Sequence, residues 1–299
     1  MRVWLEASGA VVELPHRAVL GRGPEASLRP DAPFASKLHA RIEWSGEEWR
    51  IRDMGSRNGT FLNRVPLDRD ESRRLSVGDG VGLGDLDVTL TILDESAPGP
   101  AAFPVDGGPP VLGSPVLLAL PAPEAPTVSV VFDGSWRVEG EDGASTALPA
   151  DGVLEVAGCR YRIELPRPAE RTPHLDVDLD LTRSTVTFLV SQDEERVELV
   201  VERLRRRVRL EGREHGYLLL LLSRARREDE ARGTEEPGWR TVDELCRMLR
   251  TDPTVLNVLV YRARRQLEAA GVASAPAIVE VRRGARRLGV PRSHEMPLT

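Results

Sequence analysis

Cysteine is scarce in this sequence, which contains only Cys159 and Cys246, far apart along the chain. Their number and spacing are not typical of a disulfide framework or of a zinc site, and this favours a reducing compartment. No apolar run approaches the length of a membrane span, because YLLLLL is too short and VLLALPAP contains prolines. The first residues, MRVWLEASGAVVELPHR, do not resemble a signal peptide, since their short apolar stretch carries Glu6 and Glu13. We therefore expect a cytoplasmic protein that does not contact a membrane.

Patterns that would indicate an enzyme are also missing from the sequence. It contains no P-loop, no glycine-rich dinucleotide loop and no recognisable nucleophile–base set. The five histidines are scattered without the spacing of metal ligands. We therefore expect no enzymatic activity, no cofactor and no bound metal ion.

Lysine is nearly absent, since Lys37 is the only one and arginine supplies the rest of the 41 basic residues. With 47 acidic residues the net charge is −6, but the charge is distributed unevenly. Residues 202–299 contain 21 Arg and 14 Asp or Glu, a balance of +7, whereas the remainder balances at −13. A basic C-terminal third is typical of a segment that binds a polyanion, although a merely solvated arginine-rich surface has the same composition.

The 299 residues suffice for two or three domains, and the composition changes along the chain accordingly. Residues 1–94 show short alternating apolar runs separated by Gly, Pro, Asn and Asp, which predicts an all-β sandwich. Residues 95–127 are rich in Pro, Gly and Ala, which predicts a semi-extended linker. Residues 128–170 contain further strand patterns and predict a small β region of unknown role. The remaining segment, residues 171–292, has a mixed α+β pattern.

Three loop motifs stand out within the predicted sandwich. The stretch DMGSRNGTFLN, residues 53–63, contains an Asn-Gly pair typical of a tight turn, together with several hydrogen-bond donors. LGRGPEA, residues 20–26, and FASKLHARI, residues 34–42, add an arginine, a serine and a histidine. Each motif alone would only stabilise a turn. Together they supply guanidinium, hydroxyl and N–H donors, which can hold something anionic.

This combination resembles the forkhead-associated (FHA) domain, a β-sandwich that binds phosphothreonine peptides. The resemblance covers residues 1–94 and implies that a phosphothreonine-containing protein is the partner, with a Ser/Thr protein kinase upstream. It implies a phosphopeptide-binding set of Arg22, Ser36, Lys37, Arg57 and Asn58. It also implies structural roles for Gly21, His39, Gly59 and Thr60, with Asn63 helping to hold the loop.

The C-terminal segment reads as a small sheet, three helices and a hairpin. Thr241 and Glu244 predict a capping box at the second helix. Asp252 and Pro253 predict the start of the third helix, and Gly271 its end. Gly216 lies inside the first helix, where glycine costs about 0.5–1 kcal/mol relative to alanine. AIVEVRR and ARRLGV predict a closing hairpin that turns at Gly284.

This order resembles the winged helix-turn-helix output domain of OmpR-type response regulators, which implies duplex DNA as a partner. In the third helix, one stripe predicts the core face: Leu256, Leu259, Val260, Ala263 and Leu267. The opposite face, which a major groove would meet, carries Thr254, Val258, Tyr261, Arg262 and Arg265. The predicted DNA-binding residues are Thr254, Asn257, Tyr261, Arg262, Arg264 and Arg265 in the helix, and Arg282, Arg283, Arg286 and Arg287 in the hairpin.

Response regulators of this class place a receiver domain before the winged helix, and no receiver pattern is present here. The combination predicts a transcriptional regulator whose DNA occupancy responds to a kinase-phosphorylated protein. An internal ligand is a further option, because Thr172 lies in RTPHLD, a plausible kinase target. The alternative is an FHA adaptor or scaffold in a kinase or secretion pathway, whose C-terminal domain docks protein rather than DNA. Neither interpretation specifies an oligomeric state.

Overall fold

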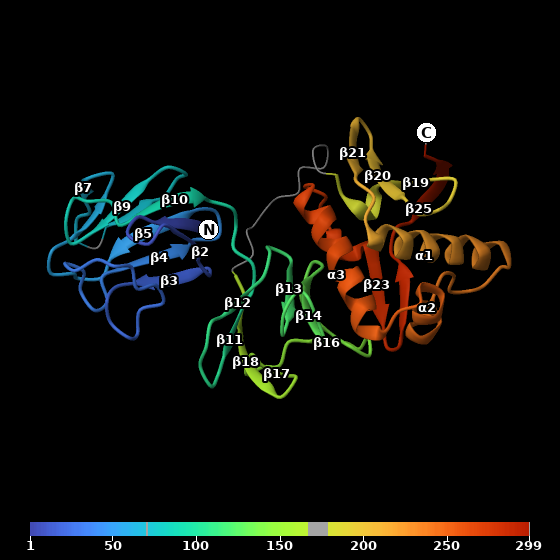
Figure 1. The fold of residues 1–299 in the computed structure, drawn as a ribbon, viewed down its shortest axis with the longest axis horizontal. Coiled ribbons are helices and arrows are strands. Elements are labelled where there is room, and N and C mark those ends of the chain that lie inside the picture. The colour runs from blue at the N-terminus through green and yellow to red at the C-terminus, as the bar shows by residue number, and fades with distance from the viewer. Residues whose placement is uncertain (70, 167–178, 299) are drawn as a thin grey trace. The chain divides into compact units, whose positions relative to one another are not determined.

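The computed structural model describes residues 1–69, 71–166 and 179–298. These residues form two compact units, one containing residues 1–103 and the other containing residues 116–162 and 179–298 (Figure 1). The predicted domain boundary at residues 170 and 171 and the candidate ligand Thr172 lie outside the described residues. Of the helices in the described part of the chain, none is both long and apolar enough to cross a membrane.

The N-terminal unit contains the β-sandwich that the alternating runs predict. A six-stranded antiparallel sheet has the order β2-β1-β10-β9-β6-β7, and a four-stranded antiparallel sheet has the order β3-β4-β5-β8. Inward side chains such as Val3, Ile42 and Ile92 are fully buried between the sheets. The strands are β1 Arg2–Leu5, β2 Ala10–Glu13, β3 Arg17–Leu20, β4 Ala40–Trp44, β5 Trp49–Asp53, β6 Thr60–Leu62, β7 Val65–Pro66, β8 Ser72–Arg74, β9 Gly80–Leu83 and β10 Leu90–Asp94.

Residues 95–127 are not the linker that their composition predicts. They contain β11 (Ala101–Pro104), β12 (Val111–Leu112) and β13 (Leu117–Leu120). All four residues of β13 are buried. The prediction was wrong because the frequent prolines obscured a short continuous apolar run, which is the pattern of a strand buried on both faces.

The region that follows continues this β structure. Strand β13 begins an antiparallel sheet of order β13-β14-β15-β16, which we call the middle sheet. Two of its turns contain Gly134 and Gly143, which share a φ of 76°, a conformation that glycine adopts without strain. A further sheet has the order β12-β11-β18-β17. The strands added here are β14 Val128–Phe132, β15 Trp136–Gly140, β16 Ser145–Ala147, β17 Val153–Val156 and β18 Cys159–Glu164.

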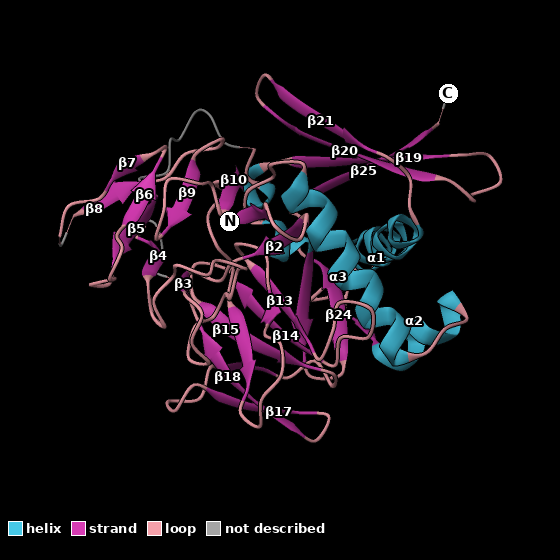
Figure 2. Cartoon of the chain, turned by 60° about the vertical axis from the view of Figure 1, so that its left-hand side comes forward, coloured by secondary structure: helices cyan, strands magenta, loops and turns pink. Residues whose placement is uncertain are grey.

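The C-terminal elements follow the predicted order of sheet, three helices and hairpin (Figure 2). They form a sheet of order β21-β20-β19-β25 and a three-stranded sheet of order β22-β24-β23. Their bounds are η1 Leu181–Arg183, β19 Thr185–Val190, β20 Val197–Arg203, β21 Arg206–Leu210, α1 Glu214–Ala231, β22 Arg240–Thr241, α2 Val242–Leu249, α3 Pro253–Ala269, η2 Ala275–Ile278, β23 Val279–Arg282, β24 Ala285–Leu288 and β25 Arg292–Pro297.

Strand β25 is an addition to the predicted fold, because the domain was expected to end at residue 292. It pairs in parallel with β19 over six residues, from Arg292 opposite Thr185 to Pro297 opposite Val190. Its sequence RSHEMP is mostly polar and ends in proline, so it lacks the alternation by which strands are recognised.

The helix limits agree with the capping signals. The amide of Glu244 donates to Thr241 Oγ1 at 3.2 Å, and the amide of Thr241 donates to Glu244 Oε2 at 2.7 Å. Asp252 Oδ1 accepts from the amide of Val255 at 2.9 Å, and Gly271 follows the end of α3 with a φ of 75°. These bonds are local in sequence, which is why the sequence alone predicts where α2 and α3 begin and end.

The packing of these helices agrees with the predicted core stripe except at one position. All five stripe residues of α3 are buried. Val258 is buried as well, although it was placed on the opposite face. Helix α2 also packs against α3, so the buried side of α3 is wider than one stripe. Gly216 has a packing reason, because a Cβ there would lie 2.7 Å from the carbonyl oxygen of Val197 in β20.

Candidate functional site

The predicted phosphopeptide residues lie on loops that meet at one end of the N-terminal sandwich. The amide of Arg22 donates to the carbonyl of Ser36 at 3.1 Å, and the amide of Gly23 donates to the carbonyl of Lys37 at 2.9 Å. The amide of Arg57 donates to Ser36 Oγ at 3.1 Å. Ser36 therefore stands between the loop that carries Arg22 and the loop that carries Arg57, as the joint motif requires.

Gly21 explains how the first two loops come so close. A Cβ at this position would lie only 2.3 Å from the carbonyl oxygen of Lys37. Any larger residue would push the β3–β4 loop apart, so glycine is required by the close approach of the backbone. This is a structural role, as the family resemblance implies.

His39 ties the second loop to the third. Its ring is fully buried, its Nδ1 accepts from the amide of Ser36 at 2.9 Å, and its Nε2 lies 3.0 Å from the carbonyl of Gly59. Because Nδ1 accepts, the proton of the neutral ring is on Nε2, which donates to Gly59. Burial lowers the pKa of His39 below its ordinary value, although the Gly59 carbonyl and Asp53 oppose this effect.

The pKa of His39 leads to a testable pH dependence. The unfolded chain takes up a proton on this histidine near pH 6.5, whereas the folded unit resists it until the pH is lower. The contribution of His39 to the stability of the N-terminal unit is therefore complete above pH 6.5 and declines as the pH falls below that value. We expect nitrogen NMR of the His39 ring to show an Nε2-protonated neutral form that titrates below pH 6.5. A midpoint at or above pH 6.5 would contradict the buried acceptor role.

Asp53 organises the third loop, and the motif analysis gave it no role. Its Oδ1 accepts from the amides of Gly55 and Ser56, both at 2.8 Å. Its Oδ2 accepts from the hydroxyls of Ser56 and Thr60, both at 2.6 Å. Burial alone would raise the pKa of Asp53, but these hydrogen bonds outweigh burial and lower it. An aspartate that begins a turn and is followed by serine at the third position is a recognisable signal for this arrangement.

The remaining motif residues fix the same loop. Asn58 is exposed, and its Nδ2 donates to the carbonyl of Phe34 at 3.0 Å. Gly59 has a φ of 84°, as expected for an Asn-Gly turn. Thr60 is fully buried, and Asn63 Nδ2 donates to Asp79 Oδ1 at 2.8 Å. Asn58 is thus positioned at the rim of the loops, while Thr60 and Asn63 hold the scaffold.

The charges at this rim are positive and uncompensated. The side chains of Arg22, Lys37 and Arg57 are exposed. Within the described residues, no carboxylate forms an ion pair with any of these three. Ser36 Oγ accepts from the backbone amide of Arg57, so its own proton remains able to point outward to an acceptor. Cations and a hydroxyl donor converging on one rim make a site that suits an anion with several acceptor oxygens.

The second group of predicted residues divides into exposed and buried members. On α3, Arg262 is exposed and lies 3.1 Å from Glu214, and Arg265 lies 2.6 Å from Glu268. Tyr261, Thr254 and Asn257 are half-buried on the same helix.

The hairpin arginines have acidic or aromatic neighbours. Arg282 lies 2.6 Å from Glu236, and its guanidinium stacks 4.1 Å from the centre of the Trp239 ring. Arg287 pairs with Glu280 and also lies over Trp239. The side chain of Arg283 is 89% exposed.

Two of the predicted DNA contacts are wrong. Arg264 is only 2% exposed, and its guanidinium binds Glu139 of the middle sheet together with the carbonyls of Pro276 and Val279. Arg286 is also 2% exposed, and its Nη2 donates to Asn257 Oδ1 at 3.3 Å. Neither guanidinium can reach a phosphate in this arrangement. The periodicity of α3 and of the hairpin could not predict this burial, because residues of the middle sheet, Glu139 and Gly143, lie beside Arg264 and Arg286.

Comparison with known proteins identifies the N-terminal motifs. Residues 18–84 match the family model described as the FHA domain. FHA domain-containing protein FhaB of Mycobacterium tuberculosis (strain ATCC 25618 / H37Rv) is 34% identical over 84 residues, which are 28% of this chain and 53% of that protein. Glycogen accumulation regulator GarA of Mycolicibacterium smegmatis is 39% identical over 64 residues, which are 21% of this chain and 39% of that protein. The chain thus spans about half the length of FhaB and less of GarA.

Solved structures give the same kind of partial match. The FhaA FHA domain, complexed with the intracellular domain of Rv3910, is 30% identical, with coverage of 28% of this chain and 90% of that chain and a TM-score of 0.25. Mycobacterium tuberculosis EmbR, in complex with a low affinity phosphopeptide, is 24% identical, with coverage of 32% of this chain and 25% of that chain and a TM-score of 0.28.

Proposed function

We propose that this chain, whose N-terminal unit contains an FHA domain, binds phosphothreonine-containing proteins and so takes its input from a Ser/Thr protein kinase. The observation that carries this proposal is the meeting of Arg22, Ser36 and Arg57 at one rim, with three exposed cations that have no carboxylate partner in the described chain. Titration calorimetry with a degenerate phosphothreonine peptide pool, against the same pool without phosphate, tests it. The chain acts in this proposal by binding rather than by catalysis.

We further propose that the C-terminal elements bind duplex DNA and that the chain is a transcriptional regulator. The order of sheet, three helices and hairpin supports this function, as does the +7 balance of residues 202–299. Arg262 and Arg265 lie on α3, and Arg282, Arg283 and Arg287 lie on the hairpin. Arginines in these two places can reach base edges and phosphates when a helix enters the major groove.

A specific observation favours the adaptor alternative, in which this surface docks protein. Four of these arginines pair with carboxylates of the same chain, namely Arg262 with Glu214, Arg265 with Glu268, Arg282 with Glu236 and Arg287 with Glu280. A basic surface that carries its own counter-charges attracts phosphates less strongly than its arginine count indicates. Salt dependence separates the two functions.

If duplex DNA is the partner, log affinity should fall linearly with log salt, by about 0.9 for each phosphate neutralised. We expect the double variant Arg262→Ala/Arg265→Ala to weaken binding and to reduce this slope by about 2, because two phosphate or base contacts are removed. Fluorescence anisotropy with a randomised duplex pool, repeated at several salt concentrations, measures the affinity and its salt dependence. Arg232→Ala is the control, since Arg232 is an exposed, acid-paired arginine at the end of α1. A flat salt response, or no duplex binding, would favour the adaptor.

A further inference from the structure

A turn of the middle sheet contacts the backbone at the tip of the β23–β24 hairpin, where Arg282, Arg283 and Gly284 remain exposed. The amide of Gly284, at the hairpin turn, donates to the carbonyl of Asp142. Gly143 is packed so closely that a Cβ would lie 2.2 Å from Arg286 Nη1 and 2.4 Å from the carbonyl oxygen of Arg282. Residues 140–143, which we call the cap turn, therefore contact the hairpin backbone directly.

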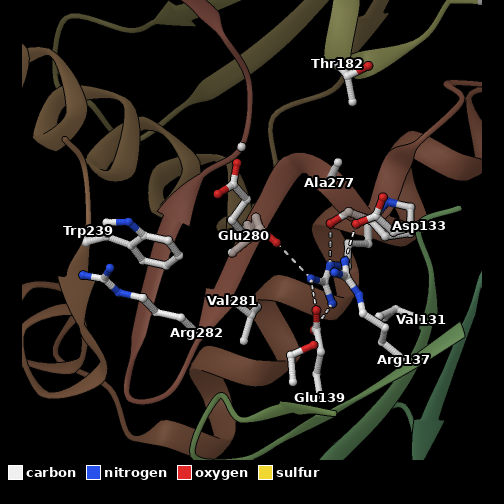
Figure 3. Close-up of a pocket in the computed structure, with 15 residues that line it drawn as sticks. Val131, Asp133, Arg137, Glu139, Thr182, Trp239, Ala277, Glu280, Val281 and Arg282 are labelled. Carbon is white, nitrogen blue, oxygen red and sulfur yellow. Dashed lines mark hydrogen bonds and ion pairs between the residues drawn. The ribbon is translucent and has the colours of Figure 1, made fainter. Parts of the chain in front are cut away.

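A buried ion pair anchors the same sheet to α3. Glu139 precedes the cap turn, and its two carboxylate oxygens accept from Arg264 at 2.6 and 3.2 Å (Figure 3). The Glu139 side chain is 11% exposed and the Arg264 side chain is 3% exposed. The cap turn and this ion pair together hold the flank of α3 and the hairpin tip.

The covering segment is acidic and the covered surface is basic. Glu139, Glu141 and Asp142 lie within four consecutive residues, EGED. Asp142 Oδ2 lies 4.0 Å from Arg283, and Glu139 binds Arg264. Asp142 thus lies beside Arg283, whose guanidinium suits the phosphates of a polyanion, while Glu139 neutralises the buried Arg264.

The contacts that tie the middle sheet to α3 and the hairpin, at Glu139 and Asp142, are polar. The buried core cluster of the C-terminal elements runs from Leu179 to Val290 and includes no residue of the middle sheet. A pocket of about 430 Å³ lies beside the ion pair, lined by Val131 and Arg137 from the sheet and by Trp239 and Val281 from the C-terminal elements. An attachment without a continuous apolar interface can open without disrupting either core.

We propose that the cap turn is an intramolecular cover that must leave the hairpin tip before that tip contacts DNA. This inference rests on the proposed DNA binding. While the turn amide of Gly284 bonds to Asp142 and the backbone contacts Gly143, this side of the hairpin tip cannot enter a minor groove or contact a phosphate backbone. The cap turn and the duplex compete for the same surface of the hairpin. Binding of a duplex to this surface must therefore also favour release of the cap turn.

The substitution Gly143→Ala tests the cover in the full chain. It places a methyl group against the hairpin backbone and should expel the cap turn. We expect its affinity for a randomised duplex pool to rise by about 5–150-fold, the usual range for coupled equilibria. Gly134→Ala is the matched control, because Gly134 has the same φ of 76° in a neighbouring turn and nothing lies within 4 Å of its Cβ position. Gly134→Ala introduces the same backbone strain but does not displace the cap turn. The affinity of this variant for the duplex pool should therefore stay unchanged.

A reversible lock provides the converse test. In a Cys159→Ser/Cys246→Ser background, Asp142→Cys and Arg283→Cys place two thiols at the contact between cap and hairpin. We expect the oxidised form to bind the duplex pool more weakly than the reduced form of the same variant. Equal affinity in all variants and both redox forms would overturn the cover but leave the proposed DNA binding intact. Tighter binding by the locked form would show that the sheet belongs to the DNA surface. No duplex binding by any form would remove the DNA function and the cover with it.

Discussion

Arg22→Ala is expected to lower the affinity for phosphothreonine peptides by at least about thirtyfold, because truncating one partner of a hydrogen-bonded charge pair costs about 2–5 kcal/mol. The guanidinium is the group that can form paired hydrogen bonds with a phosphate dianion. The unit should stay folded, because the side chain of Arg22 is exposed and its structural contact, the bond from its amide to Ser36, is retained in alanine.

Titration calorimetry with a phosphothreonine peptide measures the loss, and thermal unfolding checks the fold. Arg74→Ala is the control, because Arg74 is an exposed arginine in β8 of the same unit, with 60% of its side chain accessible. It changes the net charge by the same amount and should leave the affinity unchanged. Equal affinity of Arg22→Ala and the original chain would remove the assignment of this site, whatever the comparisons indicate.

The three loop motifs of the N-terminal unit could be recognised because each is a short, local run of residues. Gly21 and Gly59 are needed for backbone reasons that a glycine in a turn motif indicates directly. His39 could be assigned a structural role only through the family resemblance, because its two partners lie on different loops. Asp53 was missed although the aspartate before a Gly-Ser turn is a recognisable signal, because the bond from Thr60, which completes its four hydrogen bonds, comes from seven residues further along the chain.

In the C-terminal elements, the helix limits could be predicted from the sequence but the environment of Arg264 could not. Thr241, Asp252 and the α3 stripe were predicted because caps and periodicity depend on residues within one helix. Arg264 was placed on the flank of α3 and assigned to a phosphate, because the pattern within α3 shows no partner for it. Its partner, Glu139, is 125 residues away in sequence, inside a region with no predicted role. A residue whose environment comes from a remote segment cannot be placed by periodicity alone.

The pair between Arg264 and Glu139 carries the largest expected effect on stability. We expect Arg264→Ala to lower the free energy of unfolding of the second unit by about 3–5 kcal/mol, because it leaves Glu139 nearly buried without its counter-charge. The carbonyls of Pro276 and Val279 also lose their donor, which adds to the cost of desolvation. Denaturant unfolding, followed by fluorescence of Trp136 and Trp239, measures the change.

The double variant Arg264→Met/Glu139→Leu distinguishes the contribution of the two charges to stability from the contribution of the volume that their side chains fill. Replacing both charges with apolar side chains of similar size leaves no stranded charge, so we expect it to be more stable than Arg264→Ala. Arg232→Ala, which removes an exposed pair with Glu228, should change stability by no more than about 0.5 kcal/mol. A loss for Arg264→Ala as small as that of Arg232→Ala would contradict the anchoring role of the pair. The cost of truncation also exceeds that of opening the cap, because both charges become solvated when the middle sheet moves away, whereas truncation strands one charge in place.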